Sequence, residues 1–260
     1  MPSVRTEPID KWVRGYVGGT AVVDTRRPVL FWEESFPVPA YAFVRDDVAM
    51  DLLRPSAAEP HDVPFFVGPK GPVSQWFDLS LDGREVPHVA WVRNDPALSD
   101  LVVFSWQTGL VDRWLEEDEE VRGHPRDPHK RVETVASSRH VEVRVGGVTL
   151  AESDRPVLLL ETDLPTRYYV PRSDVRFETL TASDNHSLCP YKGETSEYWS
   201  VAGPPEVRNV AWSYWSPLPA VQKVAGMVCF YNEVVDLIVD GAEQERPVSP
   251  FSEPRHRPGA

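Results

Sequence analysis

Hydrophobic and polar residues alternate over short segments through much of the chain, a pattern typical of β-strands. The clearest case is 139–145, where valines alternate with polar residues before Gly146-Gly147. Paired glycines supply the positive φ that a tight two-residue turn needs, so 139–151 is predicted to form a hairpin. The apolar run 156–160 has the length of a buried strand.

Two short helices are expected among further strands. Ser173, followed by acidic residues, predicts an N-capped helix over 173–178 in which Asp174 also has a capping role. A second short helix is predicted over 219–224. The remaining predicted strands are 12–17, 29–32, 75–81, 86–92, 102–106, 198–201, 207–214 and 228–231. The predicted fold class is therefore mainly β with minor helix.

The chain also contains an internal repeat. Val17-Gly18-Gly19 returns as Val145-Gly146-Gly147, an offset of 128 positions. Matches that follow in order are Arg27-Pro28-Val29-Leu30 with Arg155-Pro156-Val157-Leu158, Glu33 with Glu161, Tyr41 with Tyr168, Arg45 with Arg172, Asp47 with Asp174, Lys70-Gly71 with Lys192-Gly193, Trp76 with Trp199, and Val89-Ala90-Trp91 with Val210-Ala211-Trp212. Because loops tolerate changes in length, we expect two tandem copies of one small domain, each of about 100 residues.

Composition predicts the domain boundaries. The first domain is expected over 10–122 and ends after the acidic run Glu116–Glu120, which we expect to be a solvated face. The stretch 123–138 is rich in proline and charge, as linkers are, and the second domain is expected over 139–240. The stretch 241–260 has too little apolar content to repay its ordering entropy and is predicted to be a flexible tail.

Charge and composition exclude several classes of protein. The formal charge is −13, from 27 Lys plus Arg against 40 Asp plus Glu, so no nucleic-acid partner is expected. No segment has the roughly 20 apolar residues that span a bilayer, and the N-terminus lacks a secretory signal. These features favour a soluble cytoplasmic protein without a membrane partner. The two cysteines exclude a disulfide framework and a four-cysteine zinc site, and no metal or other cofactor is predicted.

The densest group of reactive residues lies in the second copy, at Cys189-Pro190-Tyr191-Lys192-Gly193. A nearby ammonium favours the thiolate, so Lys192 would activate Cys189 as a nucleophile. Alternatively, Cys189 is a buried structural thiol and Lys192 lies over aromatic faces in a structural turn. Glu161 is either a general acid or base, which would make it a third candidate catalytic residue, or part of the structure.

Aromatic residues of the second copy are candidates for the wall of a pocket. Neighbours on a strand face opposite sides, so Trp212 and Tyr214 should share a face that excludes Trp215. Such a face is either core or the wall of a site for a flat or cationic ligand. Arg172 is either an anion clamp or the partner of a structural carboxylate. The residues predicted to contact a ligand are Tyr169, Arg172, Tyr191, Tyr198, Trp212 and Tyr214.

The first copy lacks part of this signature. It has Val67-Gly68-Pro69-Lys70-Gly71 in place of the cysteine motif, and Arg93 at the position of Tyr214. We interpret the first copy as a scaffold that has lost the function of the second. If the element is only a structural turn, the first copy has formed that turn with different residues.

The order of these motifs resembles the bacterial family of domain of unknown function 427, and more narrowly its tandem two-copy members. The resemblance covers nearly all of 10–240 and is strongest at 189–193 and at Val210-Ala211-Trp212-Ser213-Tyr214. It implies a small β-rich domain similar to the β-tent folds of methionine sulfoxide reductase B and the thalidomide-binding domain of cereblon. Those relatives hold zinc through two Cys-x-x-Cys pairs, which this chain lacks. The family has also been labelled nucleotidyltransferase-like, and Gly18-Gly19 with Asp24 is a faint match to such a motif.

Three hypotheses about function follow, in order of preference. The first is a binding module or enzyme for a small molecule of unknown identity, with an aromatic-lined pocket in the second copy. The second is a structural or interaction protein built as an intramolecular pseudo-dimer. The third is an enzyme that uses Cys189 for covalent or redox chemistry; a nucleotidyltransferase is a further alternative that the acidic residues do not support. The sequence leaves open whether the protein is an enzyme and whether it forms a homo-oligomer.

Overall fold

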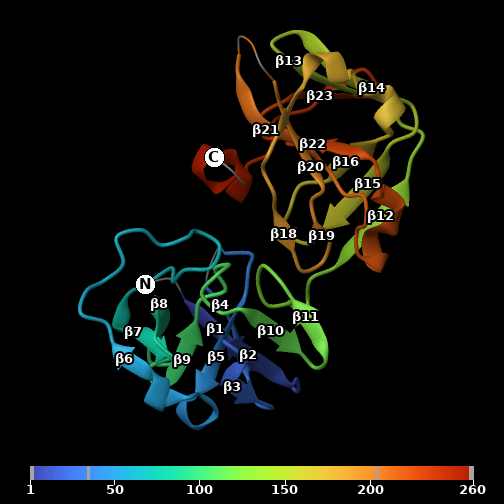
Figure 1. Cartoon of the computed structure of the whole chain (residues 1–260). Coiled ribbons are helices and arrows are strands. Elements are labelled where there is room, and N and C mark those ends of the chain that lie inside the picture. The colour runs from blue at the N-terminus through green and yellow to red at the C-terminus, as the bar shows by residue number, and fades with distance from the viewer. Residues whose placement is uncertain (1–2, 34–35, 202, 204, 258–260) are drawn as a thin grey trace. The chain divides into compact units, whose positions relative to one another are not determined.

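The chain forms two compact units, 1–127 and 128–260, each built mainly from β-strands. The structure, a computed structural model, describes residues 3–33, 36–201, 203 and 205–257. Figure 1 shows strands and short turns in both units. The predicted fold class, two tandem copies of a small β-rich domain, is confirmed by the identical strand orders described next.

Each unit contains a large antiparallel sheet of seven strands with the same topology. In the first unit the order is β1 (Val4–Pro8), β4 (Val29–Glu33), β5 (Ala40–Val44), β9 (Leu101–Phe104), β8 (Arg84–Arg93), β7 (Val73–Leu81) and β6 (Leu53–Pro55). In the second unit it is β12 (Val132–Ala136), β15 (Val157–Glu161), β16 (Arg167–Val170), β22 (Val228–Phe230), β21 (Val207–Ser213), β20 (Glu197–Val201) and β17 (Thr181–Ser183). The strands correspond one to one.

A second, four-stranded sheet also recurs in the two units. Its order is β11 (Glu119–Val121), β10 (Arg113–Glu116), β2 (Val13–Val17) and β3 (Thr20–Thr25) in the first unit, and β24 (Ala242–Glu243), β23 (Asp236–Val239), β13 (Val141–Val145) and β14 (Val148–Ser153) in the second. The predicted hairpin at Gly146-Gly147 is confirmed, with φ of 56° and 80° at the two glycines. The second unit adds a two-stranded hairpin, β18 (Leu188–Cys189) with β19 (Gly193–Glu194).

Helical segments among the described residues are short 3-10 turns: Arg45–Asp47, Met50–Leu52, Arg172–Asp174, Phe177–Thr179, Pro219–Val224, Pro250–Ser252 and Pro254–His256. The segment 219–224 lies where a helix was predicted. The capped helix over 173–178 is wrong, because two separate turns replace it and neither has a side-chain cap. Asp174 instead accepts hydrogen bonds from Ser153 Oγ at 2.7 Å and from Arg155 at 3.1 Å.

The irregularities of the sheets recur as well. The β2–β3 hairpin has a bulge at Gly15/Tyr16, and β13–β14 has one at the equivalent Val143/Arg144. The registers also correct one match of the internal repeat. Trp76 pairs with Trp91 as Tyr198 pairs with Trp212, so Trp76 corresponds to Tyr198 rather than to Trp199.

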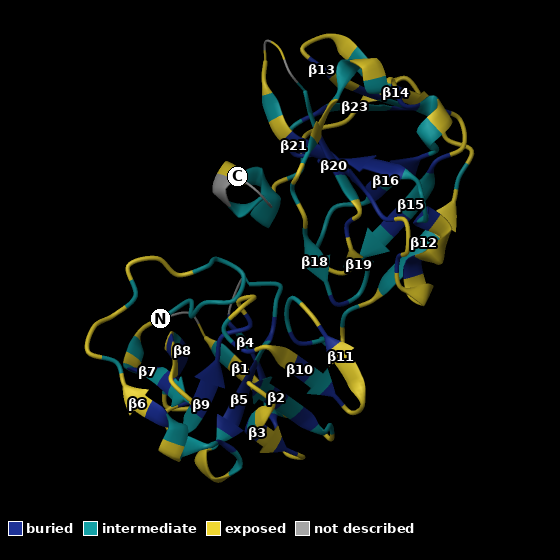
Figure 2. Cartoon of the chain, in the orientation of Figure 1, coloured by how far each residue is buried: buried dark blue, intermediate teal, exposed yellow. Residues whose placement is uncertain are grey.

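The main core of each unit lies between its two sheets. Figure 2 shows buried residues along the central strands of both units. The two cores differ in the sizes of the side chains at one pair of neighbouring positions. Gly15 lies directly against the Trp114 ring, whereas Val143 stands opposite Leu237 at the equivalent pair of positions.

The structure corrects three expected boundaries. Residues 132–136, predicted as linker, form β12 at the edge of the second unit's large sheet, and β1 likewise precedes residue 10. Of the acidic run predicted to be a solvated face, residues 117–120 are exposed, whereas Glu116 is buried and accepts hydrogen bonds from Tyr41 and Lys11. In the expected flexible tail, Ser249 Oγ donates to Glu233 at 2.5 Å and Phe251 packs against Tyr231. The last part of that tail, 258–260, lies outside the described residues.

Candidate functional site

Aromatic side chains of the second unit gather on the face of the large sheet that points away from the small sheet. As strand alternation predicted, Trp212 and Tyr214 share this face, while Trp215 lies off it and is 53% exposed. Tyr169 and Tyr198, from β16 and β20, join them. We call this group, together with Tyr231, the aromatic layer.

The aromatic layer is tightly packed and internally hydrogen-bonded. Trp212 Nε1 donates to the Tyr169 hydroxyl at 3.0 Å, and the Tyr198 hydroxyl lies 2.8 Å from Ser187 Oγ. Burial raises the pKa of the Tyr169 and Tyr214 hydroxyls well above their ordinary values, so both are neutral at physiological pH. These aromatic residues are buried in the structure.

Three charged side chains meet beside this layer. Glu161, at the end of β15, is 6% exposed and pairs with Lys192 Nζ from the turn between β18 and β19. Its other oxygen lies 3.9 Å from Lys130 Nζ, whose side chain is 5% exposed. Burial lowers the pKa of Lys192, but the adjacent Cys189 and Glu161 outweigh this and raise it above the ordinary value. Two ammonium groups thus share one carboxylate away from water.

The two cysteines have different surroundings. Cys189 is partly exposed and hydrogen-bonds to Lys192, so the predicted proximity of thiol and ammonium is present. Cys229, which no sequence argument singled out, is fully buried, and burial raises its pKa to about 12. Because the thiolate is the reactive form, Cys229 is an inert core residue.

A second buried ion pair beside the aromatic layer was missed by sequence reasoning. Arg167 Nη1 and Nη2 donate to Glu233 at 2.6 and 2.8 Å, and the guanidinium lies 5.8 Å from the Trp212 ring centroid. Neither residue recurs in the first unit, where Ala40 stands at the position of Arg167. Arg167 begins β16 and Glu233 lies in the turn after β22, so no local sequence pattern could have paired them.

Two predicted ligand contacts are placed differently. Arg172 forms an ion pair with Glu197 at 2.6 Å and lies over Phe177 and Trp215 rather than in the aromatic layer. The structural alternative for Arg172, a carboxylate partner, is the arrangement observed. Tyr191 is half-buried in the turn between β18 and β19, beside Lys192.

The first unit neutralises the equivalent glutamate in another way. Glu33, the counterpart of Glu161, pairs with the buried guanidinium of Arg93 from β8, at the position of Tyr214. The Lys70 backbone N–H donates to Glu33 at 2.7 Å, but its ammonium donates to the carbonyl oxygens of Phe65 and Gly68. Burial lowers the pKa of Lys70 to about 8. A strand arginine therefore replaces the turn lysine as the partner of this carboxylate.

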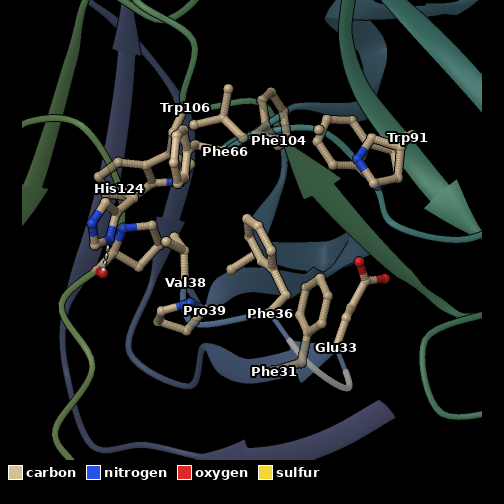
Figure 3. Close-up of a pocket in the computed structure, with 15 residues that line it drawn as sticks. Phe31, Glu33, Phe36, Val38, Pro39, Phe66, Trp91, Phe104, Trp106 and His124 are labelled. Atoms are coloured by element: carbon tan, nitrogen blue, oxygen red, sulfur yellow. Dashed lines mark hydrogen bonds between the residues drawn. The ribbon is translucent and has the colours of Figure 1, made fainter. Parts of the chain in front are cut away.

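A small cavity lies at the corresponding place in the first unit (Figure 3). Its volume is about 30 Å³, and its aromatic lining residues are Phe31, Phe36, Phe66, Trp91, Phe104 and Trp106. Glu33 and His124 add polar groups to the lining. The sequence analysis placed a pocket only in the second copy.

The residues of the faint nucleotidyltransferase motif lie in the small sheet of the first unit. Gly18 and Gly19 form the β2–β3 turn, and Asp24 accepts a hydrogen bond from Trp12 Nε1 at 2.7 Å. Within the described ranges, no group of three or more His, Cys, Asp or Glu side chains is arranged to hold a metal ion. Of the helical segments that the structure describes, none has the length and apolar character needed to cross a membrane.

Comparison with known families agrees with the duplicated fold. The family model described as a domain of unknown function (DUF427) matches residues 5–117 and again 133–241. The chain belongs to this family as a tandem two-copy member. The first matched segment includes residues 5–8 of β1 and the second includes residues 133–136 of β12, both of which lie outside the domain boundaries predicted from the sequence. No curated protein matches the chain at a significant level.

Proposed function

We propose that the protein binds a small anionic molecule in its second unit, with the anionic group held by Lys192 and Lys130. The observation that carries this proposal is the excess of buried positive charge, since two largely buried ammonium groups share one carboxylate. Burying a charge without a full partner is costly, and a second anion beside the lysines would reduce that cost.

The surroundings of the lysines support a ligand that has an apolar part as well as an anionic group. Tyr198 and Ser187 present hydroxyl groups near the turn that carries Lys192, and the Trp212 ring lies deeper in the same layer. Aromatic side chains favour flat apolar groups. The ligand class is therefore a small carboxylate or phosphate ester. The two free thiols suit a reducing compartment, and we place this activity in the cytoplasm.

The test uses the full chain and a thermal-shift titration with inorganic phosphate, acetate and benzoate. A ligand that binds only the folded state raises the midpoint, by about 2.7 kcal/mol of stability at one hundred times its Kd. Lys192→Met and Lys130→Met should each weaken the response at least tenfold, whereas Glu161→Gln should retain or strengthen it because a competing carboxylate is gone. Lys223→Met, which removes an exposed lysine of the same unit, is the matched control. Equal responses of wild type, Lys192→Met and Lys223→Met would refute the proposal.

A second candidate function, thiol chemistry, is favoured by the hydrogen bond between Lys192 and Cys189. An ammonium that favours the thiolate accelerates alkylation at neutral pH. The rate of Cys189 alkylation by iodoacetamide, measured against pH in wild type and Lys192→Met, tests it. A slower reaction in the variant at pH 7 supports the candidate, and identical pH profiles count against it.

A further inference from the structure

The ammonium group of Lys70 in the first unit has only neutral partners. It donates hydrogen bonds to the backbone carbonyl oxygens of Phe65 and Gly68. It also lies 4.2 Å from the ring centroid of Phe36 and 4.9 Å from that of Phe65. Within the part of the chain that the structure describes, no carboxylate lies within ion-pair distance of this ammonium group. Lys70 is half-buried, so water compensates its charge only in part.

The second unit shows why Lys70 has no carboxylate partner. Lys192, the counterpart of Lys70, pairs with Glu161. In the first unit the equivalent Glu33 pairs instead with the guanidinium of Arg93, and it accepts only the backbone N–H of Lys70. Arg93 has therefore replaced the lysine as the counter-ion of this glutamate, while the lysine itself has been retained in its turn.

The other lysines of the chain have different surroundings. Lys11, Lys130 and Lys192 each form an ion pair with a carboxylate. Lys223 donates to a backbone carbonyl oxygen, as Lys70 does, but its side chain is exposed to water. Among the described lysines, only Lys70 combines partial burial with the lack of a carboxylate partner.

This environment favours loss of the proton from the Lys70 side chain. Burial disfavours the charged form of a lysine, and it lowers the pKa of Lys70 from 10.5 to about 8. About a tenth of the Lys70 side chains therefore carry a free amine at pH 7, against less than about one in a thousand for a lysine with an ordinary pKa. The free amine is the nucleophilic form.

From these contacts we infer that Lys70 is a reactive amine that forms an imine with small aldehydes. The lone pair of the amine attacks the aldehyde carbon, and the nitrogen gives up both of its protons to the carbonyl oxygen, which leaves as water. A C=N bond thus replaces the C=O bond. A proton from solvent then converts the imine to an iminium ion, and the sequence needs neither an oxidant nor a reductant.

The contacts of Lys70 favour an aldehyde over other electrophiles. An iminium ion keeps a positive charge near the Phe36 and Phe65 rings and keeps one N–H for a carbonyl oxygen. An acylated amine is neutral and would lose the attraction of the rings. A carbamate would place a negative charge beside two carbonyl oxygens. The rings also offer apolar surface to a short alkyl chain.

This site is independent of the anion site proposed in the second unit, because the two share no residue. The test incubates the full chain at pH 7.5 with propanal and sodium cyanoborohydride, which reduces each iminium ion to a stable secondary amine. Peptide mass spectrometry then gives the rate of propylation at each lysine. Lys70 should react at least tenfold faster than Lys223, the matched lysine without a carboxylate partner.

Two variants test the role of the missing counter-ion. Arg93→Gln frees Glu33 to pair with Lys70, as Glu161 pairs with Lys192, and should slow the propylation of Lys70 at least tenfold. Glu33→Gln combined with Arg93→Gln removes both charges of the buried pair and should return the rate to that of wild type.

If these variants do not fold, trace acetylation of wild type with acetic anhydride between pH 6 and pH 10 replaces them, because its rate follows the free amine. The rate at Lys70 should reach half its maximum near pH 8, whereas the rate at Lys223 should still rise above pH 9. The inference is overturned by equal propylation of Lys70 and Lys223, by an unchanged rate in a folded Arg93→Gln protein, or by matching pH profiles of the two lysines.

Discussion

At the scale of single residues, the second unit places two ammonium groups, those of Lys192 and Lys130, beside the single carboxylate of Glu161. Because Glu161 is the partner of both lysines, removing the carboxylate should cost more stability than removing one ammonium group. Removing one partner of a buried ion pair is costly when the other charge is left without compensation. Lys130 remains to compensate Glu161 if Lys192 is removed.

Glu161→Gln should therefore destabilise the second unit more than Lys192→Met does. We expect a loss of about 3–5 kcal/mol for Glu161→Gln, and a clearly smaller loss for Lys192→Met. Urea denaturation of the two variants at pH 7 measures the difference. Equal losses would show that Lys130 does not share the carboxylate.

Asp174 predicts a dependence on pH. The hydrogen bond from Arg155, helped by Ser153 and Ser173, lowers its pKa from 3.8 to about 2. A carboxylate with a depressed pKa in the folded state adds stability above its unfolded pKa, and that stability disappears as the pH falls toward the folded value. Asp174→Asn should thus be less stable than wild type at pH 6, and the gap should narrow between about pH 4 and pH 2.

The measurement is the free energy of unfolding of both proteins across that pH range. Asp47→Asn is the matched variant, since Asp47 is held in the same way by Arg27 and Thr25 in the first unit and its pKa is also lowered. A gap that stays constant down to pH 2 would contradict the assignment.

Sequence reasoning found part of the site at this scale. Lys192 was selected because it stands beside Cys189 and Glu161 because it is a carboxylate of the repeat, and the structure brings the two together. Lys130 was missed because it stands in a stretch with linker composition, and Arg167 with Glu233 because no local pattern joins residues 66 positions apart. Such pairs form only when β16 and β22 lie side by side in the sheet.

At the scale of elements, the two cores fill the space between two neighbouring strands of the small sheet with different pairs of residues. Gly15 leaves room for the Trp114 ring, because a Cβ there would lie 2.6 Å from it. Val143 and Leu237 share the same volume more evenly in the second unit. A large side chain on one strand therefore requires a small residue opposite it on the neighbouring strand.

Gly15→Val should accordingly destabilise the first unit by about 1–3 kcal/mol through overpacking. Combining it with Trp114→Leu, which recreates the pair found in the second unit, should restore part of the loss. A double-mutant cycle by chemical denaturation gives the coupling energy between the two positions. Additive effects would mean that the two side chains are not in contact.

Central strands were more predictable than edges. Alternation identified β13, a central strand whose two faces differ sharply in burial. The edge strand β12 shows no such contrast, since none of its residues is buried. The 3-10 turns at 172–179 were taken for a helix because capping residues and acids also occur in turns held by tertiary hydrogen bonds.

At the scale of the whole molecule, each unit contains a complete pair of sheets. A fragment covering 128–260 should fold and unfold cooperatively, because it keeps β12 and the contacts of Ser249 and Phe251 with the second unit. A fragment covering only 139–240, the boundary drawn from composition, should be less stable. Thermal unfolding followed by circular dichroism compares the two, and equal midpoints would show that these additions contribute nothing.

The sequence predicted the duplication of the domain, but not the cavity in the first unit. Repeated motifs predicted two like domains, and the matching strand orders confirm them. The first copy was interpreted as a scaffold because it lacks the cysteine motif, and the structure adds a small cavity in it that Ala40 helps to line. Small residues carry little signal, because the space they leave depends on the neighbouring strands.

The matched sizes of Gly15 and Trp114 have a consequence for the evolution of the gene. Tandem repeats are prone to unequal crossing-over, which would splice the start of one copy to the end of the other. A chimaera with Val143 facing Trp114 would be overfilled, and one with Gly15 facing Leu237 would be hollow. We expect recombinants of this kind to fold poorly, so the mismatch would oppose homogenisation of the two halves by recombination.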